Sequence, residues 1–248
     1  MPRFFIDIAS ENIAWPEIVI KGDDARHIAR SLRMAVGDEI TVCDKDANEY
    51  RARLTKIRDE ECTAEILDSF RATSELPVYV TLYMAFPKGD KLETVIQKAT
   101  ELGVGRIVPF ESSRCIKRPK EDKIDKQLQR YRRIAEEAAK QSGRALIPEI
   151  SAPMSFEEML RDATALKKAI FCYENETEHR LGKIISSLCE GEAVSVIVGS
   201  EGGFSPDEAA RATEAGCLSV TLGRRILRCE TAPLFVLSAI GYQLELLN

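Results

Sequence analysis

From residue 78 onward, continuous apolar segments alternate with amphipathic ones, and this alternation limits the possible fold more than any other feature. The apolar segments at 78–86, 106–110 and 193–199 read VYVTLYMAF, RIVPF and AVSVIVG, and stretches with helical periodicity separate them. Strands that are apolar along their length are typical of a parallel sheet covered by helices on both faces. Because ligands bind at the carboxyl ends of such strands, the loops after Phe86, Val198 and Leu222 are candidate sites.

The first 70 or so residues have a different pattern. Short segments at 38–44, 49–57 and 61–68 are typical of half-buried strands, and one helix is expected near 23–34. A polar stretch, RATSELP, follows these segments, ends in proline and is predicted to be a linker. The expected fold class is therefore α/β, with a small β-rich domain before a larger parallel-sheet domain. The predicted domains are residues 1–72 and 73–248.

Composition narrows the class of protein. The chain has 248 residues, of which 44% are hydrophobic and 30% charged, and no apolar run approaches the length of a membrane span. The start, MPRFFIDIAS, lacks the apolar core of a signal peptide, so a cytoplasmic protein without a membrane partner is expected. Seven scattered cysteines without a C-x-x-C pair indicate neither disulfides nor a zinc site, so no metal is expected. The net charge of -5 argues against indiscriminate coating of nucleic acid.

The loop after Val198 is rich in glycine and reads GSEGGFSPDE. Its spacing matches neither G-x-G-x-x-G nor a phosphate loop ending in G-K-[ST]. Residues 205–208 supply a helix cap, a proline at the first helical position and a glutamate three residues after the cap. These carboxylates compensate the helix dipole and would repel a phosphate, so an uncharged or cationic ligand fits better. Taken alone, the loop is better explained as a tight connection without a ligand.

A second loop, LGRRILRCETAP, places three arginines between an apolar strand and the final helix. Such a density of arginine at the carboxyl end of a strand is unusual for a plain connection. An ion pair of Arg228 with Glu230 or Glu201 would nevertheless account for it structurally. A third loop, MAFPKGDKLE, brings Lys91 and a helix start to the same edge, and without a partner it is best explained as a plain turn.

Basic residues form two further groups. Residues 112–133 carry nine Lys or Arg against three Asp or Glu, which suits a solvated helix face and an RNA-contacting face about equally. Three arginines at 26, 30 and 33 recur at helical spacing and are expected on one helix face. That face would follow RNA phosphates or, alternatively, would be a solvated face balanced by neighbouring aspartates. The candidate RNA contacts are Arg26, Arg30, Arg33, Arg114, Lys117 and Arg118.

Together, VGSEGGFSPDE and LGRRILRCETAPLFVLSAI resemble the paired C-terminal motifs of the RsmE family. These are SPOUT-class methyltransferases that modify N3 of a uridine in small-subunit (16S) ribosomal RNA. The segments RFFID, HIARSLRMAVGDEI, KATELGVGRIVPF and EEAAKQSGRALIPEI are also similar, so the resemblance covers nearly the whole chain. It implies an N-terminal PUA-like RNA-binding β-barrel and a C-terminal SPOUT domain with a deep trefoil knot that binds S-adenosylmethionine. It also implies a homodimer that acts on ribosomal RNA within the assembled small subunit.

Three positions depart from the family pattern. The glycine loop usually reads G-P-E-G-G where this chain has Ser200, and the arginine loop usually has Thr where this chain has Cys229. The helix before Gln-Ser often has Glu where this chain has Lys140. These departures leave every glycine of the loop in place, together with Glu201, Arg228 and Glu230.

The resemblance also assigns residues. Arg228 would stabilise a uracil anion, while Gln141 and Arg144 would grip the base or its phosphates, and the side chains of Ile226 and Leu227 would wall the adenine. Whether Glu201 meets the sulfonium or holds the loop through backbone N–H groups is left open, with the structural role favoured. The catalytic candidates are Arg228, Glu230, Gln141 and Arg144. The cofactor-binding candidates are Gly199, Glu201, Gly202, Leu222, Gly223, Ile226, Leu227 and Arg228.

Other functions stay open at this point. A nucleotide enzyme of the Rossmann type is disfavoured by the missing phosphate fingerprint and by the carboxylates at the helix start. A ribosome assembly factor that binds RNA without activity is harder to reconcile with the acidic charge balance. A SPOUT methyltransferase that acts on another RNA position is the remaining alternative.

Overall fold

The computed structural model describes residues 1–116 and 123–247, and it divides into two compact units. The first unit comprises Met1–Glu75 together with Ala139–Leu146, and the second comprises the other described residues. The end of helix α3 (Ile124–Ser142) and the segment that follows it therefore belong with the N-terminal unit. The predicted boundary after residue 72 does not include the grouping of residues 139–146 with the first unit. The domain boundary itself stays a prediction.

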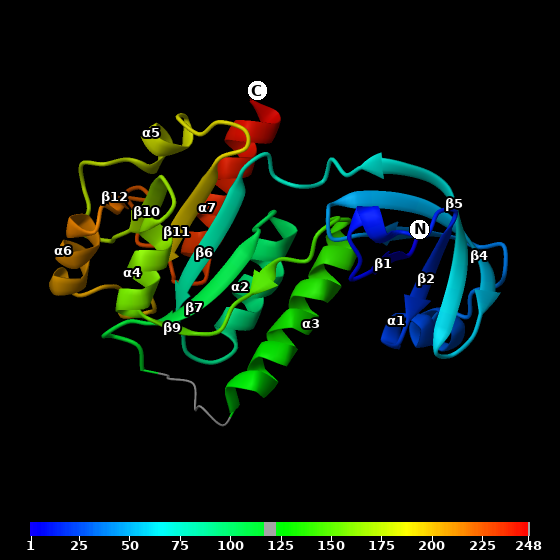
Figure 1. Ribbon diagram of the computed structural model, residues 1–248. Coiled ribbons are helices and arrows are strands. Elements are labelled where there is room, and N and C mark those ends of the chain that lie inside the picture. The colour runs from blue at the N-terminus through cyan, green and yellow to red at the C-terminus, as the bar shows by residue number, and fades with distance from the viewer. Residues whose placement is uncertain (117–122, 248) are drawn as a thin grey trace. The chain divides into compact units, whose positions relative to one another are not determined.

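The first unit is built on a curled five-stranded sheet with the order β1-β3-β4-β5-β2 (Figure 1). β1 runs parallel to β3, and the other pairs are antiparallel. Alternate residues of β4 and β5 are buried with residues of a short helical segment, as their alternating pattern predicts. This is the PUA-like module that the resemblance implies. Its elements are β1 (Arg3–Phe5), η1 (Ser10–Asn12), β2 (Glu17–Lys21), α1 (Asp23–Arg26), η2 (His27–Ser31), β3 (Glu39–Cys43), β4 (Asn48–Ile57) and β5 (Glu61–Arg71).

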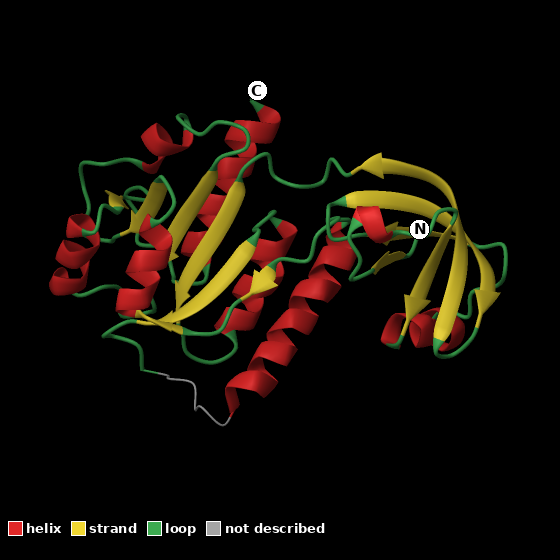
Figure 2. Cartoon of the chain, viewed as in Figure 1, coloured by secondary structure: helices red, strands yellow, loops and turns green. Residues whose placement is uncertain are grey.

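The second unit contains a parallel sheet with the order β12-β10-β11-β6-β7-β8, and β9 also pairs with β7. Helix α4 packs on one face and α7 on the other, so the central strands are buried on both sides (Figure 2). The predicted parallel sheet is confirmed, whereas the trefoil knot stays a prediction. The remaining elements are β6 (Tyr79–Ala85), α2 (Lys91–Glu101), β7 (Arg106–Glu111), β8 (Glu149–Ile150), β9 (Met154–Ser155), α4 (Phe156–Thr164), β10 (Lys168–Cys172), α5 (Leu181–Ile185), β11 (Ala193–Val198), α6 (Pro206–Glu214), β12 (Leu218–Val220), α7 (Thr231–Gly241) and η4 (Tyr242–Leu246).

Strand order decides where the loops lie. Because β12, β10, β11 and β6 are successive parallel neighbours, the segments that follow them leave the sheet at the same edge. Phe204, in the loop after β11, anchors that edge to the core, since its ring centroid lies 4.3 Å from that of Phe171 on β10. The three loops predicted from sequence are therefore brought together, and the loop after β10 joins them.

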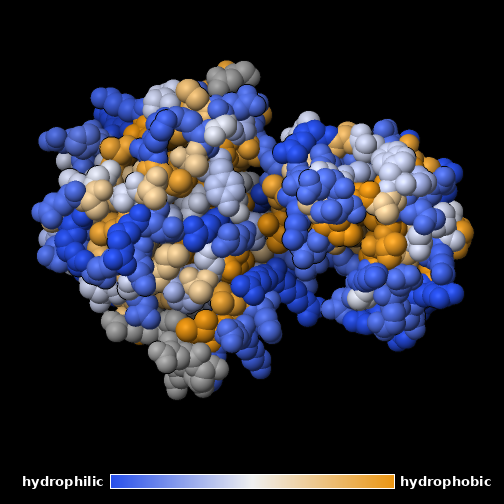
Figure 3. Space-filling model, in the orientation of Figure 1, coloured by the Kyte–Doolittle hydropathy of each residue, from blue (hydrophilic) through white to orange (hydrophobic). Residues whose placement is uncertain are grey.

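The surface of the two units is mixed. Hydrophilic residues cover much of the face shown in Figure 3, with apolar residues scattered between them. Within residues 1–116 and 123–247, no helix has both the length and the apolar character that a bilayer span requires.

Candidate active site

A cavity of about 1250 Å³ lies where the loops after β10, β11 and β12 meet the start of α7. Its wall combines apolar side chains, glycine backbone and several charged groups, a composition typical of a small-molecule site. All eight cofactor-binding candidates are part of this wall, although no ligand contact tests them. They are Gly199, Glu201, Gly202, Leu222, Gly223, Ile226, Leu227 and Arg228.

The glycines after β11 are required by close packing. A Cβ at Gly199 would lie 3.1 Å from the Phe204 ring, and one at Gly202 would lie 2.9 Å from the Cβ of Arg114. Gly203 has a φ of +62°, and its N–H donates to the carbonyl of Ser200 at 3.0 Å, which closes the turn. The closed turn, with no side chains of its own at 199, 202 and 203, forms part of the cavity wall.

The N-terminus of α6 is fully engaged by the protein itself. Ser205 and Glu208 form the predicted capping box, in which each side chain accepts a hydrogen bond from the other residue's backbone N–H. Glu208 is only 3% exposed and also accepts the backbone N–H of Ser113 at 2.7 Å and its hydroxyl at 2.8 Å. Burial alone raises the pKa of Glu208, but the four donors outweigh it and lower that pKa. A buried carboxylate at this helix start disfavours a phosphate ligand.

Lys91, at the start of α2, connects two of the loops. Its Nζ lies 3.0 Å from Oε1 of Glu201 and 3.1 Å from Oε2 of Glu230. Glu201 also accepts the backbone N–H of Lys88 at 3.0 Å and 3.2 Å through its two oxygens. Burial raises the pKa of each glutamate, but Lys91 and backbone N–H groups outweigh it, so both pKa values fall below their ordinary range. Glu201 therefore holds the loop in this structure, which is the role that sequence reasoning favoured.

The residue next to Glu230 is a buried thiol. Cys229 donates its S–H to Oε2 of Glu230 at 3.2 Å. Burial, together with this hydrogen bond, raises the pKa of Cys229 to about 12, so the thiol stays protonated and serves only as a weak donor. Cys229, which stands where the family usually has Thr, thus also donates a hydrogen bond to Glu230.

Among the described residues, the Arg228 guanidinium does not form the ion pair with Glu201 or Glu230 that would explain the arginine loop structurally. Across residues 1–116 and 123–247, neither Glu201 nor Glu230 pairs with it, and no hydrogen bond or ion pair engages its guanidinium. Its carbonyl oxygen accepts the backbone N–H groups of Thr231 and Ala232 at 2.9 Å and 3.0 Å, which fixes the backbone at the start of α7. The guanidinium lines the cavity and is available to a ligand.

Ile226 and Leu227 differ in their surroundings. Leu227 packs against the core of the second unit, whereas Ile226 is 88% exposed at the rim of the cavity. In this structure Leu227 is positioned to wall a ligand. The role of Ile226 as an adenine wall stays a prediction.

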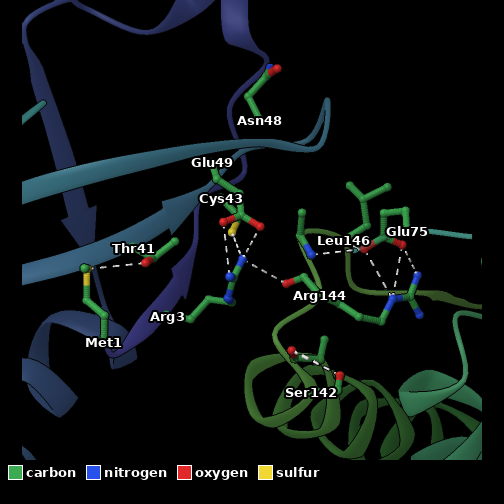
Figure 4. Close-up of polar contacts among 12 residues, drawn as sticks. Met1, Arg3, Thr41, Cys43, Asn48, Glu49, Glu75, Ser142, Arg144 and Leu146 are labelled. Carbon is green, nitrogen blue, oxygen red and sulfur yellow. Dashed lines mark hydrogen bonds and ion pairs between the residues drawn. The ribbon is translucent and has the colours of Figure 1, made fainter. Parts of the chain in front are cut away.

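Gln141 and Arg144 lie in the first unit, and neither is among the described residues that line the cavity. Figure 4 shows the Arg144 guanidinium against the carboxylate of Glu75, to which its Nε donates at 3.1 Å. The carbonyl of Arg144 accepts from Arg3 at 3.3 Å, and the residue is 3% exposed. Gln141 is exposed near the end of α3. The expected grip of Arg144 on the RNA base would require this buried ion pair to break.

The arginines of the first unit do not form the single face that their spacing predicts. Helix η2 ends at Ser31, and Arg33 follows it with a φ of +51°, so the prediction of one shared helix face is wrong for Arg33. A left-handed residue reverses the chain and turns its side chain off the helix face. Arg26 pairs with Asp23 and with Glu60, and Arg30 pairs with Asp59.

Arg114 has a structural contact with the glycine loop. Its Nη1 donates to the carbonyl of Gly202 at 2.9 Å, and its Cβ packs on the same residue. A role in RNA binding stays a prediction for this side chain. The candidates Lys117 and Arg118 lie outside the described residues.

Comparisons with known proteins define the class first. A family model described as an RNA methyltransferase domain matches residues 74–241, and one described as an RNA methyltransferase PUA domain matches residues 20–67. The ribosomal RNA small subunit methyltransferase E of Bacillus subtilis (strain 168) is 36% identical over 100% of this chain and 99% of its own length. The enzyme of the same name from Synechocystis sp. is 31% identical over 96% of this chain and 77% of its own.

Solved structures agree with the sequence comparison. The ribosomal RNA small subunit methyltransferase E of Neisseria gonorrhoeae, bound to S-adenosylmethionine, has a TM-score of 0.84 and 32% identity. The match covers 98% of this chain and 97% of that one. The chain belongs to the ribosomal RNA small subunit methyltransferase E family.

Proposed function

We propose that this protein transfers a methyl group from S-adenosylmethionine to N3 of a uridine in small-subunit (16S) ribosomal RNA. The observation that carries the proposal is the cavity between the glycine loop and the arginine loop, with the free guanidinium of Arg228 in its wall. Family membership supports the reaction class, since the relatives named above are small-subunit ribosomal RNA methyltransferases.

The residues of the cavity fit this cofactor. S-adenosylmethionine has no phosphate and carries a positively charged sulfonium, and the nearby helix start of α6 is already engaged by Glu208. Gly199 and Gly202 present no side chain of their own at the wall, and a Cβ at either position would crowd Phe204 or Arg114. Leu222, Gly223 and Leu227 would hold the apolar part of the ligand. When bound, the cofactor supplies an electrophilic methyl carbon.

Arg228 would act on the uracil. Methylation of N3 requires loss of the imide proton, and the negative charge that results spreads over the uracil oxygens. A cation at the cavity wall, placed where this charge develops, stabilises it electrostatically. Lys91 links Glu201 of the glycine loop to Glu230, two residues after Arg228, and so helps to hold the backbone that carries this guanidinium. The target base must leave its pairing partner to present N3.

A mass-spectrometric experiment tests the proposal. Small subunits from cells that lack the protein are incubated with the protein and S-adenosylmethionine, and the modified nucleotide is then mapped. One methyl group on N3 of a single uridine is the expected result. A methyl group on another base or on ribose would move the enzyme to a different RNA position, and no methyl transfer despite cofactor binding would leave an RNA-binding assembly factor.

We also propose that the protein works as a cytoplasmic homodimer. Four large apolar side chains of the C-terminal helical segment are exposed in one chain: Phe235, Tyr242, Leu246 and Leu247. Apolar side chains gathered on one segment are typical of an association surface. In this proposal residues 73–248 form the knotted catalytic domain and residues 1–72 contribute to binding RNA. Sedimentation equilibrium should give twice the chain mass, and Leu246→Asp should lower it to the mass of one chain.

A further inference from the structure

Three carboxylates belong to the described wall of the cavity, and two of them already have partners. Glu201 is held by Lys91 and by the backbone N–H of Lys88. Glu176 accepts the backbone N–H of Glu178 at 2.8 Å and that of His179 at 3.1 Å. These two hydrogen bonds contribute most to holding the pKa of Glu176 at about 2.

The third carboxylate, Glu174, is unpartnered. It lies two residues beyond the end of β10, and no hydrogen bond or ion pair from residues 1–116 or 123–247 engages it. Lys91, the lysine of the cavity wall, is already shared between Glu201 and Glu230. Glu174 therefore contributes a negative charge to the cavity that the described protein does not pair.

Contact with the glycine turn fixes where this charge lies. A Cβ at Gly203 would come within 2.0 Å of Oε1 and 2.7 Å of Cδ of Glu174, so the carboxylate rests directly on the backbone of Gly203. A side chain at position 203 would push this carboxylate aside, and the φ of +62° at the position favours glycine. The exposed Glu174 side chain thus lies against the turn that forms one wall of the cavity.

We propose that the Glu174 carboxylate binds the positively charged methionine part of S-adenosylmethionine, a proposal that rests on the proposed function. That part of the cofactor carries two cations, the sulfonium and the α-ammonium. Although Glu174 is exposed, its carboxylate lies against the turn at the cavity wall, where Coulomb attraction to a cation bound in the cavity acts at short range. Glu201, the carboxylate that sequence reasoning considered for the sulfonium, is already engaged by Lys91 and by the backbone N–H of Lys88. Glu174 takes that place.

Calorimetry with three ligands tests the assignment. Dissociation constants are measured for S-adenosylmethionine, S-adenosylhomocysteine, which lacks the sulfonium charge, and methylthioadenosine, which lacks both cations. The variant is Glu174→Gln, which keeps the shape and removes the charge. The matched control is Glu178→Gln in the same loop, whose side chain is not part of the described cavity wall. Thermal unfolding confirms that each variant is folded.

Glu174→Gln should weaken S-adenosylmethionine about tenfold and leave methylthioadenosine within about twofold, the loss expected for one charge-assisted hydrogen bond. Equal weakening of S-adenosylhomocysteine assigns the contact to the ammonium, and weakening of S-adenosylmethionine alone assigns it to the sulfonium. Unchanged affinity for S-adenosylmethionine, or equal loss for all three ligands, would overturn the inference. Failure of the proposed function shows separately, because the wild-type protein would then not bind S-adenosylmethionine or not methylate RNA.

Discussion

Lys91 Nζ lies 3.0 Å from the carboxylate of Glu201, and the same ammonium lies 3.1 Å from Glu230. One side chain at the start of α2 thus connects the glycine loop to the start of α7. Hydrogen bonding to Glu201 is the largest cause that raises the pKa of Lys91, so the ammonium stays charged at neutral pH. The position of both loops around the cavity depends on this cation.

Lys91→Met should weaken S-adenosylmethionine binding about tenfold and lower the melting temperature, because two partly buried carboxylates lose their partner. Lys91→Arg should restore most of the affinity. Lys98→Met is the control, since Lys98 lies on the same helix and pairs only with Glu101 across one turn. Calorimetry and thermal unfolding measure both quantities. An affinity within twofold of wild type in Lys91→Met would remove Lys91 from the site.

Arg228→Ala should reduce kcat for RNA methylation by about 100-fold or more, the loss typical of removing one group that stabilises developing charge. The dissociation constant for S-adenosylmethionine should stay within about threefold, because the cofactor is expected to contact this residue through its backbone. Arg161→Ala on α4 is a control arginine outside the described cavity wall. Single-turnover kinetics with small subunits separate the two effects. A large loss of cofactor affinity with kcat intact would place Arg228 in cofactor binding alone.

Arg144 and Glu75 should behave as one structural pair. Removing either charge leaves the other buried, so Arg144→Gln and Glu75→Gln should each lower the unfolding free energy of the first unit by roughly 3–5 kcal/mol. Denaturant titration, followed by Trp15 fluorescence from the first unit, measures this change. If Arg144 grips the RNA base instead, Arg144→Gln will abolish methylation at unchanged stability while Glu75→Gln has no effect.

Glu208 should make stability depend on pH in the acidic range. Its pKa is lowered in the folded protein, so its contribution is fully present above the pKa of the unfolded chain, at roughly pH 4 to 5, and is lost as pH falls through the folded value. Glu208→Gln should cost roughly 1–3 kcal/mol at pH 7 because a buried network loses an acceptor. The difference between wild type and variant should narrow below about pH 4. Melting temperatures from pH 3 to 7 measure it, and a constant difference would contradict the assignment.

Much of the second unit could be predicted from periodicity alone. The apolar runs marked β6, β7 and β11 because strands buried on both faces cannot alternate with polar residues. Ser205 and Glu208 marked the start of α6 because a capping box is local chemistry, formed within four residues. In the first unit, the pairing of β1 with β3 was not predicted, since three residues carry little periodic signal.

The candidate site was predicted in its loops but not in its contacts. The glycine and arginine loops were identified from composition, whereas the loop after β10, with Glu174, was missed because its sequence YENETEH has no distinctive motif. An ion pair of Arg228 with Glu201 or Glu230 was the structural alternative for the arginine loop, but Lys91 pairs with both carboxylates. Lys91 lies 110 residues from Glu201 in the chain. Its loop was placed at the same sheet edge, but its pairing with the two glutamates was not predicted.

By itself the sequence determined the strands, the capped helices and the family, because these depend on local periodicity and on short motifs. The tertiary structure decided which charged side chains pair with each other and which remain available to a ligand. Strand order brings β6, β10, β11 and β12 to one edge, so side chains far apart in the chain compete for the same partners. Lys91 forms ion pairs with Glu201 and Glu230, and Arg144 forms an ion pair with Glu75. Arg228 and Glu174 line the same cavity, and within the described residues neither side chain has a hydrogen bond or an ion pair.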